Sequence, residues 1–166
     1  MKAVLGLLPW AIALVIAGVA IWFLLEHDIA LGAWLLAAFL AGHGLVHVMF
    51  LVPRPGDAAA SAGGVDWPFD LARTWPVTSA GVDPGVVRIA AAVLIGVVVV
   101  GFVLAGLATV GLLVPAGWWP GLVAVSAGAS IVLLALAFAP GLLLGLAIDA
   151  LLLGLVFTGA WTPAPA

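Results

Sequence analysis

Two histidines lie four residues apart in residues 41–53 (AGHGLVHVMFLVP), inside a run that is otherwise apolar enough to span a lipid bilayer. On a helix, His43 and His47 would share one face, so both imidazoles would point in the same direction. Inserting an ionisable side chain in a membrane-spanning helix costs at least about 2.5 to 3.5 kcal/mol of free energy on insertion scales. Such a residue is therefore expected to have a structural or functional role. The pair predicts a polar site inside an otherwise apolar segment.

Asp149 is the third ionisable residue in such a segment. Counted from Val52 and from Pro140, both His43 and Asp149 lie about nine residues into their segments, or roughly 13 Å deep on a helix. A carboxylate at that depth must be protonated or find a partner, and the histidines are the titratable residues at its level. The sequence therefore predicts a contact between His43 and Asp149.

This residue set suits three kinds of chemistry: relaying protons, ligating a transition metal through His43 and His47, or holding a cofactor such as haem or a quinone. Haem fits less well than a small cation, because its axial ligands come from opposite faces and both histidines are on one helix. The alternative is that the histidines only join helices by bonding hydroxyl groups. The hydroxyl residues available in the apolar segments are Thr109, Ser126, Ser130 and Thr158.

The composition identifies the environment of these residues. Of the 166 residues, 67% are hydrophobic and 7% are charged, and the mean hydropathy is +1.43. About a quarter of the residues of a soluble domain are charged, so these values indicate an integral membrane protein. The absence of cysteine excludes thiolate metal sites and iron–sulfur clusters within the chain. A net charge of −3 without a basic run excludes nucleic acid as a partner.

The apolar runs predict an all-α, polytopic transmembrane bundle that forms a single domain over residues 1–166. Five spans are expected, at about 3–25, 29–52, 86–114, 121–139 and 141–160. The interval 53–85 begins as a small, glycine-rich link and continues as WPFDLARTWPV, which is typical of a segment lying at the membrane interface. That interval is either a simple connector, a lid or a docking surface.

The positive-inside rule predicts the orientation. With the N-terminus inside, all four basic residues lie on the cytoplasmic side, and we expect a multi-pass protein of a prokaryotic cytoplasmic membrane. The tryptophans expected to anchor the bundle at the interfaces are Trp67, Trp75, Trp118, Trp119 and Trp161.

Two functions follow as hypotheses. In the first, His43, His47 and Asp149 form an intramembrane site that handles a cation, as in proton or metal-ion transport, or holds a cofactor. In the second, the protein is a structural or assembly subunit that contacts the lipid bilayer and other membrane subunits or a second copy of itself. An independent enzyme is not expected, because the sequence has no Ser-His-Asp spacing and no phosphate-binding glycine loop.

Overall fold

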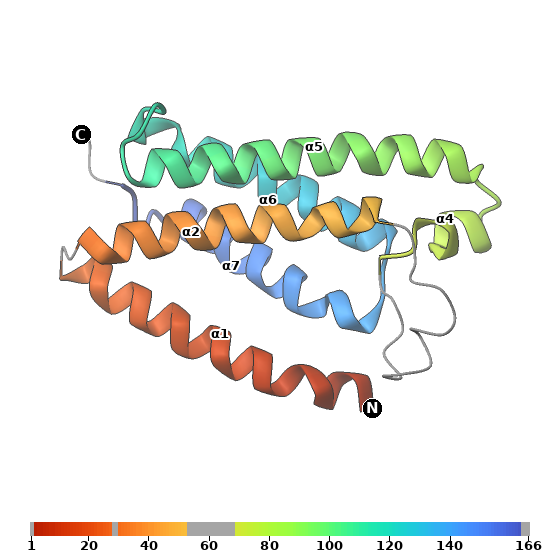
Figure 1. The fold of residues 1–166 in the computed structure, drawn as a ribbon, viewed down its shortest axis with the longest axis horizontal. Coiled ribbons are helices and arrows are strands. Elements are labelled where there is room, and N and C mark those ends of the chain that lie inside the picture. The colour runs from red at the N-terminus through yellow and green to blue at the C-terminus, as the bar shows by residue number, and fades with distance from the viewer. Residues whose placement is uncertain (1, 28–29, 53–68, 164–166) are drawn as a thin grey trace.

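The computed structural model describes residues 2–27, 30–52 and 69–163, and those residues form helices and loops without a strand (Figure 1). Side chains are described from residue 11 onward. The long helices are α1 (Lys2–Glu26), α2 (Ala30–Val46), α5 (Pro84–Thr109), α6 (Trp119–Leu136) and α7 (Leu143–Thr158). The short helices are η1 (His47–Leu51), η2 (Leu71–Arg73), α4 (Trp75–Thr78), η3 (Ala116–Trp118) and η4 (Pro140–Leu142).

Within the described residues, four helical segments are long and apolar enough to cross a membrane. They are Ala30–Leu51, Pro84–Thr109, Ala116–Leu136 and Pro140–Thr158. The shorter apolar stretch Ala11–Glu26 of α1 corresponds to the first predicted span, at about 3–25. The prediction of an all-helical, multi-pass bundle of about five spans is therefore confirmed.

Several predicted boundaries are displaced: α5 begins at Pro84 rather than at 86, α6 ends at Leu136 rather than at 139, and two further shifts have a local cause. The third span was expected to continue to residue 114, but α5 ends at Thr109. Gly111 and Leu113 both have left-handed backbone angles, φ 68° and 62°, which a right-handed helix cannot contain. The fourth span begins two residues early, at Trp119, because a proline fits in the first turn of a helix, where its missing N–H leaves no bond unmade.

α5 is the central helix of the bundle: it packs along α2 on one side and along α6 on another. α7 packs on α6, and α1 packs on α2 near the turn that joins them (Figure 1). From that turn, α1 diverges from α2, and its N-terminal end comes close to η4. The site described below therefore lies among α2, α6 and α7, while α1 stays at the edge of the bundle.

Small residues set the close approach of α2 to α5. A Cβ atom added to Gly106 would lie 2.8 Å from the carbonyl oxygen of Ala37, and one added to Gly44 would lie 2.9 Å from Cβ of Phe102. A Cβ atom added to Gly96, also on α5, would meet nothing within 4 Å. The glycines of α5 therefore have different neighbours, and Gly106 permits the close backbone-to-backbone contact that drives helix association in lipid.

The segment from Phe69 to Thr78 lies at one end of the bundle. The Trp75 indole Nε1 donates a hydrogen bond of 3.0 Å to the carbonyl oxygen of Ala135, near the end of α6. The Phe69 ring meets the Phe50 ring edge-on, with centroids 5.0 Å apart. This segment therefore covers the end of the bundle towards which His47 and Phe50 extend.

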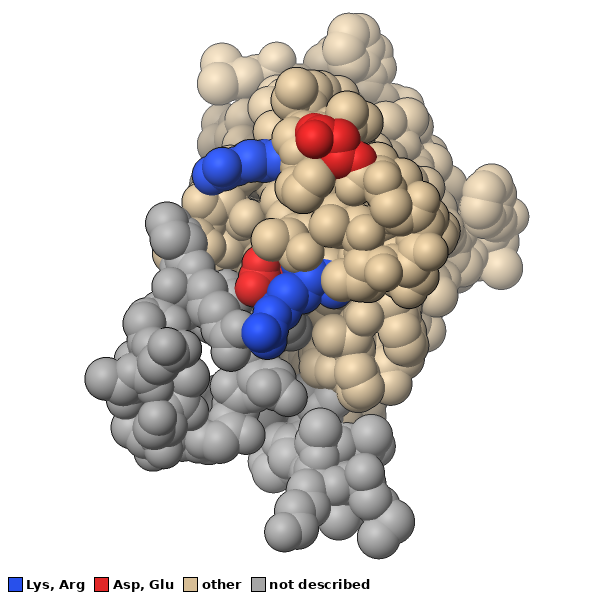
Figure 2. Space-filling view, turned by 90° about the vertical axis from the view of Figure 1, so that its right-hand side faces the viewer, with Lys and Arg blue, Asp and Glu red and all other residues tan. Residues whose placement is uncertain are grey.

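Charged side chains of both signs gather at the same end of the bundle (Figure 2). The ones described there belong to the helix starts and turns around η2 and α5, namely Asp70, Arg73, Asp83 and Arg88. Arg73 approaches Asp70 at 4.0 Å, and the Asp83 carboxylate accepts hydrogen bonds from the backbone N–H groups of Gly85 and Val86. Trp67 and the glycine-rich link lie outside the described residues.

The contact between α2 and α5 gives a testable prediction. Gly106→Ala should lower the free energy of unfolding by about 1 to 3 kcal/mol, because the new methyl group overlaps the carbonyl of Ala37 and forces the helices apart. Gly96→Ala is the matched control, and it should be neutral or slightly stabilising because its Cβ meets open space. Unfolding in mixed micelles measures both variants, and equal stability for the two would contradict this packing.

Candidate functional site

The predicted contact between His43 and Asp149 is present. His43 Nε2 donates to Asp149 Oδ1 at 2.9 Å, joining α2 to α7. Asp149 has no exposed surface, and the His43 side chain is 5% exposed. The equal depth inferred from the sequence therefore corresponds to a direct bond between two helices that are far apart in the chain.

Ser130, on α6, completes the environment of the carboxylate. Its hydroxyl oxygen lies 2.5 Å from Asp149 Oδ2 and 2.8 Å from His47 Nε2, and the residue is fully buried. His47 Nδ1 in turn donates to the carbonyl oxygen of His43 at 3.0 Å. The four hydrogen bonds form a ring that starts and ends at His43 and passes through Asp149, Ser130 and His47.

His47 lies where the geometry of the helix changes. α2 ends at Val46, and the chain continues as the 3₁₀ helix η1 from His47. Tightening of the last turn is a common way for a helix to satisfy its final carbonyls. Here the His43 carbonyl, one turn before His47, also accepts from the His47 ring, so the two histidines of one helix face have different partners.

Aromatic rings enclose the imidazoles. The Phe102 ring, from α5, meets the His43 ring edge-on at 5.1 Å between centroids. The Phe39 ring stacks on the His43 ring at 6.0 Å. The Phe50 ring lies 6.5 Å from the His47 ring. These apolar neighbours leave the carboxylate and the imidazoles to interact with one another and with Ser130.

The residues expected to ligate a metal do not form a ligand set. Among the described residues, no group of three or more His, Cys, Asp and Glu side chains is placed to hold a metal ion. Both ring nitrogens of His47 and Nε2 of His43 face hydrogen-bond partners. This arrangement can hold protons on, and move them between, the imidazole nitrogens and the oxygens of Asp149 and Ser130.

The expected tryptophan anchors lie in different environments. Trp75 and Trp118 are 52% and 64% exposed, whereas Trp119 has no exposed surface and its ring meets that of Trp161 edge-on at 5.2 Å. Trp119 Nε1 is the one fully buried side-chain nitrogen or oxygen without a hydrogen-bond partner in the described part of the chain. Trp119 thus lies in the core of the bundle, while Trp75 and Trp118 lie on its surface.

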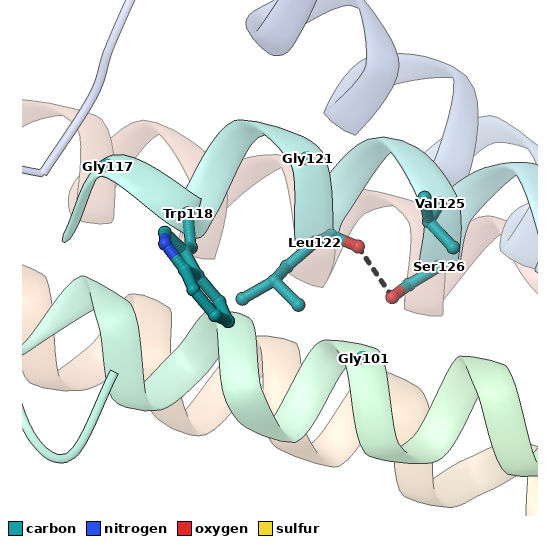
Figure 3. A pocket seen from close by; sticks show the side chains of 7 residues that line it. All are labelled: Gly101, Gly117, Trp118, Gly121, Leu122, Val125 and Ser126. Atoms are coloured by element: carbon teal, nitrogen blue, oxygen red, sulfur yellow. Dashed lines mark hydrogen bonds between the residues drawn. The ribbon is translucent and has the colours of Figure 1, made fainter. Parts of the chain in front are cut away.

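A shallow groove of about 380 Å³ runs along α5 and α6 and is separate from the polar ring (Figure 3). It is lined by Gly101, Gly117, Trp118, Gly121, Leu122, Val125 and Ser126. Its lining contains no titratable side chain, and the Ser126 hydroxyl is occupied by the carbonyl of Leu122 at 2.7 Å. The groove therefore adds no acid or base to the candidate site.

Compared with known proteins, the chain matches no family model, no curated sequence and no solved structure. The assignment of its site therefore depends on the geometry of its own residues.

Sequence reasoning identified His43, His47 and Asp149 but gave Ser130 no special role. Ser130 was one of four hydroxyl residues in the apolar segments. The other three donate to the carbonyl four residues earlier in their own helices: Thr109 to Ala105, Ser126 to Leu122 and Thr158 to Gly154. Ser130 differs because a carboxylate, which is a stronger acceptor, lies opposite it. No local signal distinguishes it in the sequence.

A double-mutant cycle tests the link between α2 and α7. We expect His43→Ala and Asp149→Ala to show a coupling energy of about 1 to 2 kcal/mol in unfolding, the upper part of the range for hydrogen bonds within membranes. His27 provides the control, because its Nδ1 bonds only the nearby Phe23 carbonyl at an exposed helix end. His27→Ala should show no coupling to Asp149→Ala, and an equally small value for His43 would contradict the bond.

Proposed function

We propose that this membrane protein binds and releases a proton within the bilayer, at the ring formed by His43, Asp149, Ser130 and His47. The supporting observation is the number of protons that the ring requires. A carbonyl oxygen only accepts, so His47 Nδ1 must carry a hydrogen. Ser130 has one hydroxyl hydrogen but lies between two partners, His47 Nε2 and Asp149 Oδ2.

One more proton is therefore needed to make every bond. If Ser130 donates to Asp149, then His47 Nε2 must also carry a hydrogen, and the His47 side chain is an imidazolium. If Ser130 donates to His47, then Asp149 Oδ2 must be protonated. In both cases the ring holds one proton more than neutral histidines and an ionised aspartate would supply.

Burial favours the presence of that proton. With it, the ring has no net charge, either as an imidazolium with a carboxylate or as a neutral histidine with a carboxylic acid. Without it, a net negative charge remains among Asp149 and its neighbours, which have no exposed or basic partner in the described structure other than the two histidines. A net charge in a low-dielectric interior is costly, so proton binding stabilises the ring.

A proton suits this site better than a transition metal or a cofactor. A metal needs ring nitrogens with free lone pairs and, in most protein sites, at least three ligands. Of the four imidazole nitrogens of His43 and His47, only His43 Nδ1 has no hydrogen-bond partner among the described residues, and the ring is filled by its own side chains. The same argument applies to haem, which would have to displace the bonded nitrogens.

His43 Nδ1 is the atom through which protons can exchange. It has no hydrogen-bond partner in the described part of the chain, and the His43 side chain is 5% exposed. The other end of the ring is closed by the His43 carbonyl. Transport of a proton across the membrane would therefore require the His47 ring to leave that carbonyl.

The protonation of the ring is directly measurable. In vesicles, ¹⁵N NMR of histidine and the infrared band of a protonated carboxyl should reveal a proton-binding event as the pH is varied. Asp149→Asn should abolish it, because the imidazoles lose the only carboxylate that balances their charge. Asp83→Asn, which alters an exposed helix-capping carboxylate, should leave it unchanged.

Two results would overturn the proposed function. One is that the His43 and His47 rings stay neutral at every pH while no carboxyl band depends on Asp149. The other is that the event persists undiminished in the Asp149→Asn protein.

A subunit role is the second candidate, and α1 favours it. Val15, Ile16 and Val19 in the middle of this helix are 64% to 65% exposed, which leaves an apolar surface without a partner in the described chain. Lipid or another membrane subunit would cover that surface. Purification under mild conditions should then retain a stoichiometric partner or a second copy, and a monomer alone with lipid would count against this candidate.

A further inference from the structure

We propose that the Ser130 hydroxyl passes the proton between His47 and Asp149, so that an imidazole of η1 and a carboxyl of α7 titrate as a single unit. This inference rests on the proposed function and assigns the route by which the proton is shared. It begins from the position of one oxygen atom, which is within hydrogen-bond distance of both groups and is fully buried.

The distances suit direct transfer. Ser130 Oγ lies 2.8 Å from His47 Nε2 and 2.5 Å from Asp149 Oδ2. The second value belongs to the short range of O–H···O bonds in which one oxygen is charged. A hydroxyl is both a donor and an acceptor, so Ser130 can receive one hydrogen while it gives up another. Neither a water molecule nor a side-chain rotation is required.

The transfer conserves atoms and charge. In the first state, His47 is an imidazolium and Asp149 a carboxylate. The Nε2–H bond of His47 breaks as a new O–H bond forms on Ser130, and the original O–H bond of Ser130 breaks as an O–H bond forms on Asp149 Oδ2. The products are neutral His47, which keeps its hydrogen on Nδ1, a serine hydroxyl and a carboxylic acid. The net charge of the ring is zero before and after.

Within the described residues, the elements packed against the ring bring no other charged side chain to it. α2 contributes His43, which donates to the other carboxylate oxygen, and α5 contributes the Phe102 ring. The remaining titratable side chains that the structure describes lie at helix ends or in turns. They are Glu26, His27, Asp70, Arg73, Asp83 and Arg88. Within the described chain, His43, His47 and Asp149 are therefore the groups that share the proton.

Ser126 is a matched control for Ser130. Both are fully buried serines of α6, one helical turn apart. The Ser126 hydroxyl donates to the Leu122 carbonyl of its own helix, beside the apolar groove (Figure 3). Among the described residues, it makes no hydrogen bond to either ring histidine or to the carboxylate. Replacing either serine by alanine removes one buried hydroxyl, but only the change at Ser130 interrupts the ring.

The test follows His47 by ¹⁵N NMR and Asp149 by its carboxyl infrared band as the pH is varied in vesicles. In the unaltered protein and in Ser126→Ala, both signals should change at the same pH. In Ser130→Ala, they should change separately, at least about one pH unit apart, because sites that no longer interact lose their shared titration. A purely structural role for Ser130 would not separate the two signals.

The outcomes distinguish this inference from the proposed function. If the unaltered protein binds a proton and Ser130→Ala still shows one shared transition, the transfer through Ser130 is wrong while the proton site remains. If the unaltered protein shows no proton binding, the proposed function itself fails. Should Ser130→Ala not fold, Ser130→Thr restores a hydroxyl and should show the shared transition, and separated transitions in folded Ser130→Thr would also overturn the inference.

Discussion

The arrangement of this bundle depends on one constraint, which is that the Asp149 carboxyl group has no access to water. A buried carboxylate without hydrogen bonds is unfavourable by several kcal/mol, so each of its oxygens must have a donor. His43 supplies the donor for one oxygen and Ser130 for the other. Because these donors come from α2 and α6, a single side chain of α7 fixes the relative heights of three helices.

That role matters because the apolar contacts of the bundle are poorly specific. In lipid, burying a leucine against another helix gains little over burying it against acyl chains, and helices associate by close packing and polar bonds instead. The close packing is provided on α5, where Gly106 admits the carbonyl of Ala37. α7 packs on α6 and α2 packs on α5, so the bond between His43 and Asp149 directly links one helix of each pair.

The sequence was sufficient for the helices and for three of the four residues of the ring. Long apolar runs must form helices in lipid, and equal depth was enough to pair His43 with Asp149. It was not sufficient for Ser130, because depth says nothing about how α6 is rotated about its axis. α6 carries two serines one helical turn apart, Ser126 and Ser130, and their spacing does not indicate which hydroxyl meets the carboxylate of α7. Trp119 illustrates the same difficulty, since its neighbour Trp118 is exposed while it is buried.

The two histidines also show why spacing alone does not define a site. Four residues apart, they share a helix face, and that pattern equally suits a metal, a proton relay or helix association. The partners of each nitrogen separate these possibilities. A nitrogen that donates to a carbonyl, as His47 Nδ1 does, cannot offer a lone pair to a metal, and it forces any further hydrogen onto Nε2 or beyond. Because Ser130 lies there with a single hydrogen to give, the ring cannot be completed without one more proton. Neutral histidines and an ionised aspartate supply one hydrogen fewer than the four hydrogen bonds need, because the ring has more acceptors than donors.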